Sequence, residues 1–440
     1  MKRIPIGELA AHLDEKVTVQ GWLQILRDQK NIQFLILRDR TGLVQVAHYK
    51  PNDPELADRI STLGTESALT LTGKVVKNEV VKLGGLEIQL EELHTENAAE
   101  TPLPFDPFDE DNIPAIDFRM DWRYLDLRRK KNLLFFQVQT LLEHAMREFW
   151  LKNSFIEIHS PKIMGSPSES GAELFEVDYF EGKAYLAQSP QFYKQMAMAA
   201  GFERVFEIGP VFRADPSFTS RHMTEFTGLD MEMSWIETHN DVLDFTDGLL
   251  QYAYQRVKDT YDTKIKEVFG VDIQVPAVPF PRLTMADTYG ILKKAGYKLP
   301  PERKGDLDPG GERAIAEYVK KEHCHDFVYI IDWPISVRPF YHMRHPDNQE
   351  LTRSFDLIAG GLEIATGAQR EHRYEVLKSQ ALEYGLGLEN IQFYLDFFRY
   401  GCPPHGGFGM GLSRLMMVML NIKNIRESVY LFRGPNRLTP

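Results

Sequence analysis

The sequence predicts a two-domain α+β protein, in which a small N-terminal β-barrel precedes a larger domain of mixed strands and helices. The chain has 440 residues, and its hydrophobic content of 43% is ample for two cores. Residues 16–95 alternate in the manner of short strands separated by turn signals. Beyond residue 130, apolar residues recur at helical spacing, and strands alternate with helices.

The barrel is expected over residues 1–103. Short strands in so short a segment fit an OB-fold, the common five-stranded barrel that binds oligonucleotides, and other small barrels fit the spacing equally well. Arg-Thr-Gly and Leu-Gly-Gly supply turn signals between strands. The expected strands are KVTVQGWLQIL, IQFLILRD, GLVQVAHY, SALTLTGKVV and LEIQLEEL.

A segment without periodicity follows the barrel. TENAAETPLPFDPFDEDNIPAID is rich in proline and acidic residues, which predicts a hinge over residues 104–130. The larger domain is expected over 131–440. It begins with a helix over residues 131–152, and further helices are expected near 240–265 and 372–385.

Charge and composition exclude several classes of protein. The net charge of -12 argues against a passive nucleic-acid coat, so any RNA binding must use local basic patches. Cys324 and Cys402 are too few for a disulfide framework or a four-ligand zinc site. The N-terminus lacks a secretion signal, and no apolar run reaches the ~18 residues of a membrane span. The expectation is a soluble, cytoplasmic protein that binds no membrane.

The most informative segment is the predicted hairpin over residues 213–230, because it gathers arginines, a histidine, an aromatic ring and carboxylates. Alternation along its second strand predicts two faces. Phe226, Gly228, Asp230 and Glu232 are expected to form a ligand floor, and Thr227, Leu229, Met231, Met233 and Trp235 are expected to face the core. Arg213 would supply a guanidinium fork for phosphate oxygens. An exposed, salt-bridged hairpin is the alternative.

Several segments carry a resemblance to one family. FRADPSFTSRHMTEFTGLDMEM resembles the second signature motif of class II aminoacyl-tRNA synthetases, in its aspartyl form. FIEIHSPKIMG, with Pro161, resembles the first motif, and GMGLSRLMM, with Arg414, resembles the third. QSPQFYKQ, GLEIATGAQR and NRLTP are similar to the archaeal and eukaryotic branch, so the resemblance covers nearly the whole chain.

The resemblance implies a fold and a reaction. An OB-fold would bind the anticodon, and an antiparallel sheet flanked by helices would carry catalysis. The protein would be a homodimer with helix 131–152 and Pro161 at the interface. It would attach L-aspartate to tRNA(Asp) through an ATP-derived aspartyl-adenylate. An adenylate-forming paralog acting as an amide ligase and a non-catalytic RNA-binding module are the competing interpretations.

The resemblance also assigns roles to the ATP side of the site. Arg213 and Arg414 would be catalytic, since such transfers depend on positioning and charge neutralisation. The expected ATP-binding residues are Arg213, Arg221, His222, Met223, Phe226, Glu363 and Arg414. Oxygen ligands for Mg²⁺ would come from Asp356, Glu363 and Thr366, the last replacing a serine of the family. Ser413 replaces a glutamate of the family, which leaves open how Arg414 is held.

Aspartate selection requires a cation, because asparagine is nearly isosteric with aspartate and differs by a charge. Lys194 and Arg370 correspond to the family residues that bind the side-chain carboxylate, and an unpaired buried cation would reject a neutral amide. Ser168 and Glu169 match a lid that closes over aspartate. The expected aspartate-binding residues are Ser168, Glu169, Gln191, Lys194, Asp230, Thr366 and Arg370.

In the barrel, Gln24, Phe34 and Gln45 correspond to family residues at the anticodon. Phe34 fits the barrel core almost equally well. In the family, the position occupied by Gln24 is associated with discrimination between tRNA(Asp) and tRNA(Asn), with tryptophan in strict enzymes and histidine in relaxed ones. Gln24 matches neither residue, and its amide can serve more than one base edge, which favours an enzyme that also charges tRNA(Asn). A solvated strand residue is the alternative.

Overall fold

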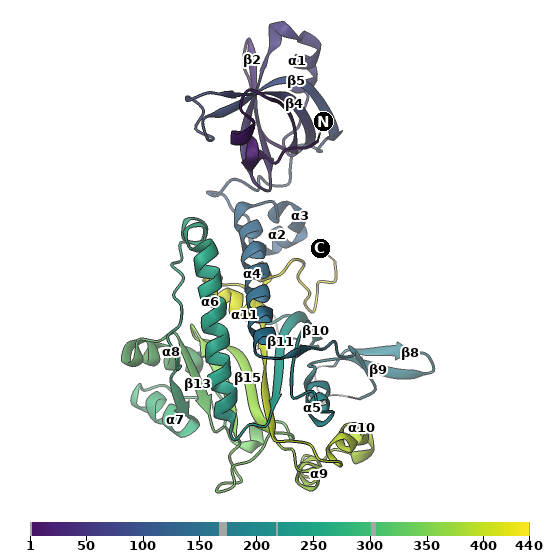
Figure 1. Ribbon diagram of the computed structural model, residues 1–440, viewed down its shortest axis with the longest axis vertical. Helices are drawn as coiled ribbons and strands as arrows, with labels where there is room; N and C mark the ends of the chain where they lie inside the picture. The colour runs from purple at the N-terminus through teal and green to yellow at the C-terminus, as the bar shows by residue number, and fades with distance from the viewer. Residues whose placement is uncertain (1, 167–173, 217–218, 301–304, 440) are drawn as a thin grey trace. The chain divides into compact units, whose positions relative to one another are not determined.

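The computed structural model describes residues 2–166, 174–216, 219–300 and 305–439. The chain divides into two compact units, Met1–Ile113 and Pro114–Pro440 (Figure 1). The division therefore falls inside the segment predicted as a hinge over 104–130. Residues after the division form two short helices, α2 (Ile116–Asp121) and α3 (Arg123–Asp126), and they belong to the second unit.

The first unit is a closed five-stranded barrel with the strand order β1-β2-β3-β5-β4, which confirms the predicted barrel. Inward-facing side chains such as Val19, Leu35, Leu37, Val46 and Leu71 are buried in its core. Closure leaves no sheet edge exposed along the barrel. The strands are β1 (Lys16–Asp28), β2 (Ile32–Asp39), β3 (Gly42–Tyr49), β4 (Ala68–Lys77) and β5 (Leu86–Asn97).

A short helix that the sequence analysis did not anticipate, α1 (Pro54–Ser61), lies between β3 and β4. Pro54 occupies its first turn, where a missing N–H costs nothing, and the Asp53 side chain accepts a hydrogen bond from the Leu56 N–H. Its apolar residues Leu56 and Ile60 pack into the barrel core, so α1 covers one end of the barrel interior.

The second unit is built on an eight-stranded sheet with the order β12-β13-β14-β15-β16-β11-β10-β6. Its central pairs are antiparallel, and the two outermost pairs, β12 with β13 and β6 with β10, are parallel. The strands are β6 (Ile156–Glu157), β10 (Arg204–Phe212), β11 (Glu225–Ser234), β12 (Arg282–Thr284), β13 (Phe327–Ile331), β14 (Ser354–Ala359), β15 (Leu362–Arg370) and β16 (His405–Gly411).

Two long helices, α4 (Lys130–Lys152) and α6 (His239–Phe269), pack against each other and against one face of this sheet (Figure 1). Trp150 of α4 stacks on Phe206 of β10 at a centroid distance of 4.6 Å. α6 begins at a capping box formed by Thr238 and Asp241, which satisfies free N–H groups of its first turn. Both helices lie where the sequence predicted helices.

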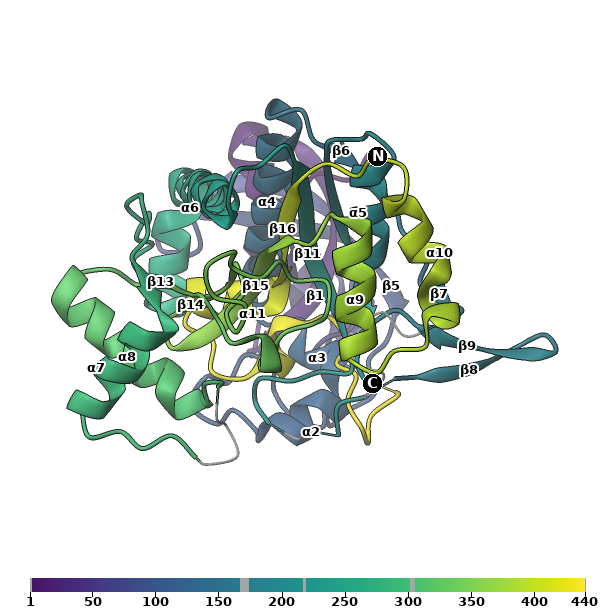
Figure 2. The same ribbon diagram turned by 90° about the horizontal axis from the view of Figure 1, so that it is seen from below.

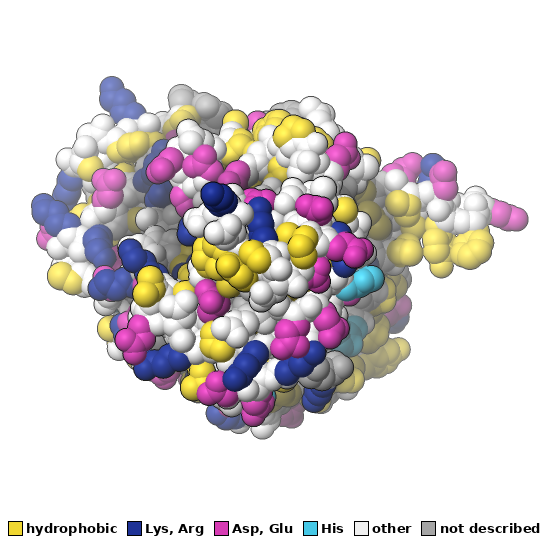
Figure 3. All heavy atoms as spheres, turned by 90° about the horizontal axis from the view of Figure 1, so that it is seen from above, with side chains coloured by type: hydrophobic (Ala, Val, Ile, Leu, Met, Phe, Trp, Pro, Cys, Tyr) yellow, Lys and Arg dark blue, Asp and Glu magenta, His cyan; other side chains and the backbone are white. Residues whose placement is uncertain are grey.

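Smaller helices and a separate small sheet flank the two sides of the large sheet (Figure 2). α7 (Met285–Lys294) and α8 (Pro309–His323) pack with the β12–β14 side around Val328, Ile330 and Trp333. On the other side lie α5 (Gln191–Ala199), α9 (Tyr374–Glu383), α10 (Leu388–Phe398) and a three-stranded sheet of β7 (Ile163–Met164), β9 (Gly182–Leu186) and β8 (Glu176–Tyr179). The β8–β9 hairpin projects from the unit, and apolar side chains gather on it (Figure 3).

The start of the second unit is tied to its C-terminal segment. Arg123 donates to the carbonyls of Val429 at 2.7 Å and Tyr430 at 3.1 Å, and Arg119 pairs with Glu427 at 3.0 Å. Asp126, fully buried, accepts from both arginines. This polar cluster joins α2 and α3 to residues that follow α11 (Leu412–Met419).

One prediction for strand β11 is wrong. Trp235 was expected in the core with Met231 and Met233, but its side chain is 69% exposed. β11 ends at Ser234, and Trp235 has a φ of 63°, so the chain turns in a left-handed conformation before the tryptophan can follow the alternation. In the described part of the chain, no helix has the length and apolar composition that crossing a bilayer requires.

Candidate active site

A cavity of about 450 Å³ lies over the central strands β11, β15 and β16. Gly228 and Asp230 line it, whereas Leu229 and Met231, which alternate with them, lie in the core cluster with α4 and α6. The cavity therefore occupies the sheet face opposite the two long helices. The expected site residues that line it are Gln191, Arg213, Arg221, His222, Met223, Phe226, Asp230, Glu363, Thr366, Arg370 and Arg414.

Glycines keep the cavity floor open. A Cβ at Gly228 would lie 2.8 Å from the carboxylate of Asp230, and one at Gly409 on the neighbouring strand β16 would lie 3.1 Å from it. A side chain at either position would displace Asp230 or fill the space above it. The backbone is thus bare where a ligand approaches most closely.

Cationic side chains gather at one end of the cavity. Arg213 lies over the ring of Phe226, with 5.7 Å between the guanidinium carbon and the ring centroid. Arg221, from the loop before β11, donates to Glu312 of α8 at 2.8 Å. Burial and the neighbouring Arg414 lower the pKa of His222 below its ordinary value, which favours the neutral ring. These groups can donate several hydrogen bonds to an anion.

Arg414 is held without help from Ser413. Its guanidinium donates to the backbone carbonyl of Glu363 at 2.9 Å and lies 3.6 Å from the carboxylate of the same residue. The Ser413 hydroxyl donates instead to the carbonyl of Ser428 at 3.4 Å. Glu363 therefore holds Arg414 across the cavity floor.

A group of oxygen atoms lies beside Glu363. The hydroxyl of Thr366 donates to the Glu363 carboxylate at 3.3 Å, and Asp356, on the neighbouring strand β14, pairs with Arg338 at 2.7 Å. Asp356 Oδ1 is buried and has no hydrogen-bond partner among the described residues. Burial raises the pKa of Asp356 to about 6, and the Glu363 charge also raises it, against the lowering effect of Arg338. Two repelling carboxylates and a hydroxyl are a donor set suited to a hard divalent cation.

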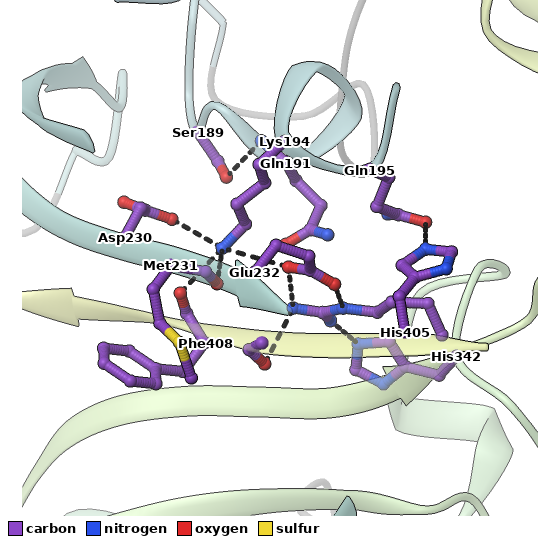
Figure 4. A network of polar contacts seen from close by, with 12 residues as sticks. Ser189, Gln191, Lys194, Gln195, Asp230, Met231, Glu232, His342, His405 and Phe408 are labelled. Atoms are coloured by element: carbon purple, nitrogen blue, oxygen red, sulfur yellow. Dashed lines mark hydrogen bonds and ion pairs between the residues drawn. The ribbon is translucent and has the colours of Figure 1, made fainter. Parts of the chain in front are cut away.

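Lys194 of α5 is buried in a network beneath the cavity (Figure 4). Its ammonium donates to Asp230 Oδ1 at 2.8 Å and to the Phe408 carbonyl at 2.6 Å, and it lies 3.6 Å from Glu232 Oε2. Two carboxylates of β11 therefore already face this lysine. Lys194 itself is not among the side chains that line the cavity.

Arg370, from the end of β15, belongs to the same network. Its Nε donates to Glu232 Oε1 at 2.9 Å, and its Nη2 donates to the Gly407 carbonyl at 3.0 Å. Glu232 was expected on the ligand floor but is fully buried, because these contacts hold it below the surface. Burial raises the pKa of Asp230 despite the lowering effect of Lys194. Two cations and two carboxylates thus support the floor of the cavity.

The remaining amino-acid candidates have different outcomes. Gln191 is buried and lines the cavity, and its Nε2 has no hydrogen-bond partner in the described part of the chain. Ser168 and Glu169 lie outside the described residues.

Side chains that sequence reasoning did not identify also line the cavity, among them Arg338, Tyr341 and His342. They come from the loop between β13 and β14, in the segment SVRPFYH, which has no periodicity and matched no motif. The guanidinium of Arg338 lies 4.1 Å from the ring centroid of Trp333, and this packing fixes its direction. The only signal in the sequence was that this segment places cationic and aromatic residues together shortly after a strand.

In the barrel, Phe34 is half-buried and alternates with the core residues Leu35 and Leu37, so it lies on the outer face and not in the barrel core. Gln45 donates to Glu87 at 2.6 Å. Gln24 lies at the β-bulge of β1, where it accepts a long hydrogen bond of 3.5 Å from Arg38. A bulge directs a side chain out of the regular strand pattern.

Family models match both units. One described as tRNA synthetases class II (D, K and N) matches residues 115–433, and one described as an OB-fold nucleic acid binding domain matches residues 17–95. Among curated proteins, the aspartate–tRNA(Asp/Asn) ligase of Aeropyrum pernix is 41% identical and covers 97% of this chain and 96% of its own length. The aspartate–tRNA(Asp) ligase of Thermococcus kodakarensis has the same identity and coverage.

Solved structures agree over the whole chain. The aspartyl-tRNA synthetase of Entamoeba histolytica is 31% identical with a TM-score of 0.88, covering 100% of this chain and 93% of its own. The asparaginyl-tRNA synthetase of Pyrococcus horikoshii, solved with asparaginyl-adenylate, is 30% identical with a TM-score of 0.90 and covers 100% of both chains. With the family model spanning the catalytic unit and relatives matching almost end to end, this chain belongs to the class II tRNA synthetases of the D, K and N group.

Proposed function

We propose that the protein is an aspartate–tRNA ligase. ATP activates L-aspartate when an α-carboxylate oxygen attacks the α-phosphorus and pyrophosphate leaves, and the aspartyl group then passes to tRNA with release of AMP. The observation that carries the proposal is one cavity that joins an arginine-rich end to the network of Lys194, Arg370, Asp230 and Glu232. The 41% identity to curated aspartate–tRNA ligases supports it.

The arginines would neutralise the reacting phosphates. Arg213, Arg221 and Arg414 line the cavity, and each presents a planar fork of N–H donors that matches phosphate oxygens. Phe226 offers the adenine a ring face in the same cavity, and His222 and Met223 lie beside it. Charge neutralisation and positioning account for most of the catalysis in such transfers.

A magnesium ion bound with ATP fits the oxygen donors of Asp356, Glu363 and Thr366. The repulsion between the two carboxylates and the unpartnered Asp356 Oδ1 favour a divalent cation there. When bound, the ion would neutralise charge on the phosphates. The residues themselves hold Arg414 and Arg338 in place through the contacts described above.

Aspartate would be selected by charge and hydrogen-bond direction. Arg370 would face the side-chain carboxylate, and Asp230, with its acceptor oxygens on the cavity floor, would face the α-ammonium. Lys194 would act from beneath by holding Asp230. Gln191 and Thr366 line the same space. Ser168 and Glu169 keep their proposed role in closing over the amino acid.

The finer proposal concerns tRNA choice. Relatives named for tRNA(Asp) and for tRNA(Asp/Asn) are equally similar to this chain, so similarity leaves the choice to local residues. Gln24, at a bulge beside Arg38, presents an adaptable amide instead of a large ring, which supports charging of both tRNAs. The barrel would read the anticodon with Phe34 and Gln45 on its outer face.

The test is kcat/KM for pure tRNA(Asp) and tRNA(Asn) transcripts. We expect a preference for tRNA(Asp) below roughly a hundredfold, which corresponds to about 2.7 kcal/mol. Gln24→Trp should raise the preference, and Gln20→Trp on the same strand is the matched control. A larger preference in the unaltered enzyme would contradict the relaxed specificity.

The assembly would be a homodimer formed around α4 and Pro161, working in the cytoplasm where tRNA is charged. For the reaction itself, the decisive experiment pairs aspartate-dependent pyrophosphate exchange with aminoacylation of purified tRNA. Both activities should depend on aspartate. Exchange without charging would instead indicate an adenylate-forming amide ligase. The absence of both exchange and charging would contradict the proposed function.

A further inference from the structure

His342 lines the cavity together with Arg370, Gln191 and Asp230, and the sequence analysis assigned it no role. It lies in the loop between β13 and β14, forms an isolated β-bridge with Arg370, and is only 1% exposed. It is nevertheless among the residues that line the cavity. The Nη1 of Arg370 lies 3.0 Å from His342 Nε2.

This contact sets the tautomer of the ring. A guanidinium has only N–H donors, so His342 Nε2 must accept, and the proton of the neutral ring must be on Nδ1. Burial, with Arg370 and Arg338 as neighbouring cations, holds the pKa of His342 well below its ordinary value, which keeps the ring neutral. His342 is therefore a hydrogen-bond donor at Nδ1.

The Nδ1–H donor has no hydrogen-bond partner among the described residues. A buried donor left without a partner is costly, so such atoms commonly have a role in ligand binding. Gln191 lines the same cavity, and its buried Nε2 donor also has no hydrogen-bond partner among the described residues. Two unsatisfied donors therefore accompany the guanidinium of Arg370 at one end of the cavity.

We infer that His342 is a specificity-determining residue, whose Nδ1–H donates a hydrogen bond to the side-chain carboxylate of the substrate aspartate. The inference rests on the proposed function. A carboxylate accepts through both oxygens and satisfies a wall of donors, whereas the –NH₂ group of asparagine brings further donors that find no acceptor there. Sites built in this way reject the mismatched analogue strongly.

Two substitutions separate direct contact from support of Arg370. In His342→Gln the side-chain amide can still accept from Arg370 at the ε position, but the δ donor is lost. In His342→Asn the amide retains a donor at the δ position, and the contact to Arg370 is lost. Aspartate-dependent pyrophosphate exchange gives KM and kcat for aspartate and for ATP, and asparagine-dependent exchange gives the discrimination.

We expect His342→Gln to lower kcat/KM for aspartate by about tenfold or more, through KM, with the KM for ATP unchanged. It should also narrow the preference for aspartate over asparagine. His342→Asn should retain more aspartate activity than His342→Gln. The reverse order would overturn the inference and make His342 a support for Arg370, and full activity in His342→Gln would also overturn it.

The control is the unaltered enzyme. If it shows no aspartate-dependent exchange, the proposed function fails. If the unaltered enzyme is active and His342→Gln is equally active, the proposed function stands and only the inference about His342 is wrong. If His342→Gln melts well below the unaltered protein, NMR of the ¹⁵N-histidine-labelled enzyme replaces it. One Nδ1–H signal should then move downfield with aspartate and not with asparagine, and the absence of that shift would contradict the proposed hydrogen bond.

Discussion

At the residue scale, the part of the cavity proposed to bind aspartate rests on an ionic network of two cations and two carboxylates. Lys194 and Arg370 come from α5 and β15, and Asp230 and Glu232 come from β11, so three elements meet through charge. Because these groups are buried, each depends on its partner for the hydrogen bonds that water would otherwise supply. The network holds Arg370 and Asp230 in fixed positions at the cavity floor.

Lys194→Met tests this dependence. We expect a loss of about 3–5 kcal/mol in the free energy of unfolding, since the substitution leaves buried carboxylates without their cation. Aspartate-dependent exchange should fall with it, although Lys194 does not line the cavity. Denaturant unfolding and exchange kinetics give the two measurements. Adding Asp230→Asn should restore part of the stability and none of the activity. Unchanged kinetics in Lys194→Met would refute this role.

Glu363→Gln should slow adenylate formation and raise the Mg²⁺ concentration needed for half-maximal exchange. The substitution makes one of the proposed oxygen ligands neutral while the Glu363 carbonyl still accepts from Arg414. A Mg²⁺ titration of exchange measures the shift, and Thr366→Ser, which keeps the hydroxyl, serves as a control near the unaltered value. An equal loss of tRNA affinity would point to misfolding.

Part of the site could be predicted from residues alone. The alternation of β11 correctly places Phe226, Gly228 and Asp230 in the cavity wall. The pattern could not show that Asp230 lines the cavity whereas Glu232 is buried below it. The burial of Glu232 depends on its contact with Arg370, which is far away in the sequence. Arg338 and His342 come from an irregular loop, whose direction is set by tertiary contacts and not by a local repeat.

At the element scale, periodicity was most reliable for long, regular segments. The five barrel strands and the two long helices carry many repeats of their pattern, and the structure confirms them. Short helices such as α1 and α5 contain too few turns for a helical period to stand out. The end of β11 was misjudged because a single left-handed residue at Trp235 stops the alternation.

The first residue of α6, His239, makes the second unit sensitive to acid. Burial lowers the pKa of His239 to about 4, and neither ring nitrogen has a hydrogen-bond partner in the described part of the chain. In the unfolded chain the ordinary pKa is about 6.5, so the unfolded state binds the extra proton first as pH falls. The stabilisation is complete above about pH 6.5 and is lost progressively toward pH 4.

Between neutral pH and about pH 5, we expect His239→Phe to lose roughly 2 kcal/mol less of its free energy of unfolding than the unaltered protein does, because phenylalanine does not titrate. Thermal unfolding at pH 7.5 and pH 5 measures the difference in Tm for each protein. His323→Phe, at an exposed histidine of α8, is the matched control and should leave the pH dependence as it was. An equal pH dependence in all three proteins would contradict the assignment.

At the scale of the whole molecule, the chain consists of two units with separate hydrophobic cores and separate functions. The barrel has its own core and no open sheet edge, and the complete cavity lies within the second unit. Anticodon reading and adenylate formation therefore depend on different cores. This separation was predictable from the change in periodicity, whereas the position of the division was not, since α2 and α3 lie in a segment without a clear pattern.

Removing residues 1–113 should therefore leave aspartate-dependent exchange within about threefold of the full chain, because the deletion touches no residue that lines the cavity. Charging of tRNA should fall by at least roughly a hundredfold as the anticodon contacts are lost. Exchange and aminoacylation measured on the same preparation give both values. Loss of exchange in a folded truncation would show that the barrel supports the active site.

The cluster that ties Arg123 to Val429 and Tyr430 has a consequence for synthesis on the ribosome. β11 also pairs with β16, so the middle of the sheet stays incomplete until the last part of the chain has emerged. The barrel needs only the first 113 residues and can fold during translation. A chain that ends before residue 405 would therefore carry a complete barrel and a sheet without β16, and the apolar side chains left uncovered on β11 and β15 would favour aggregation.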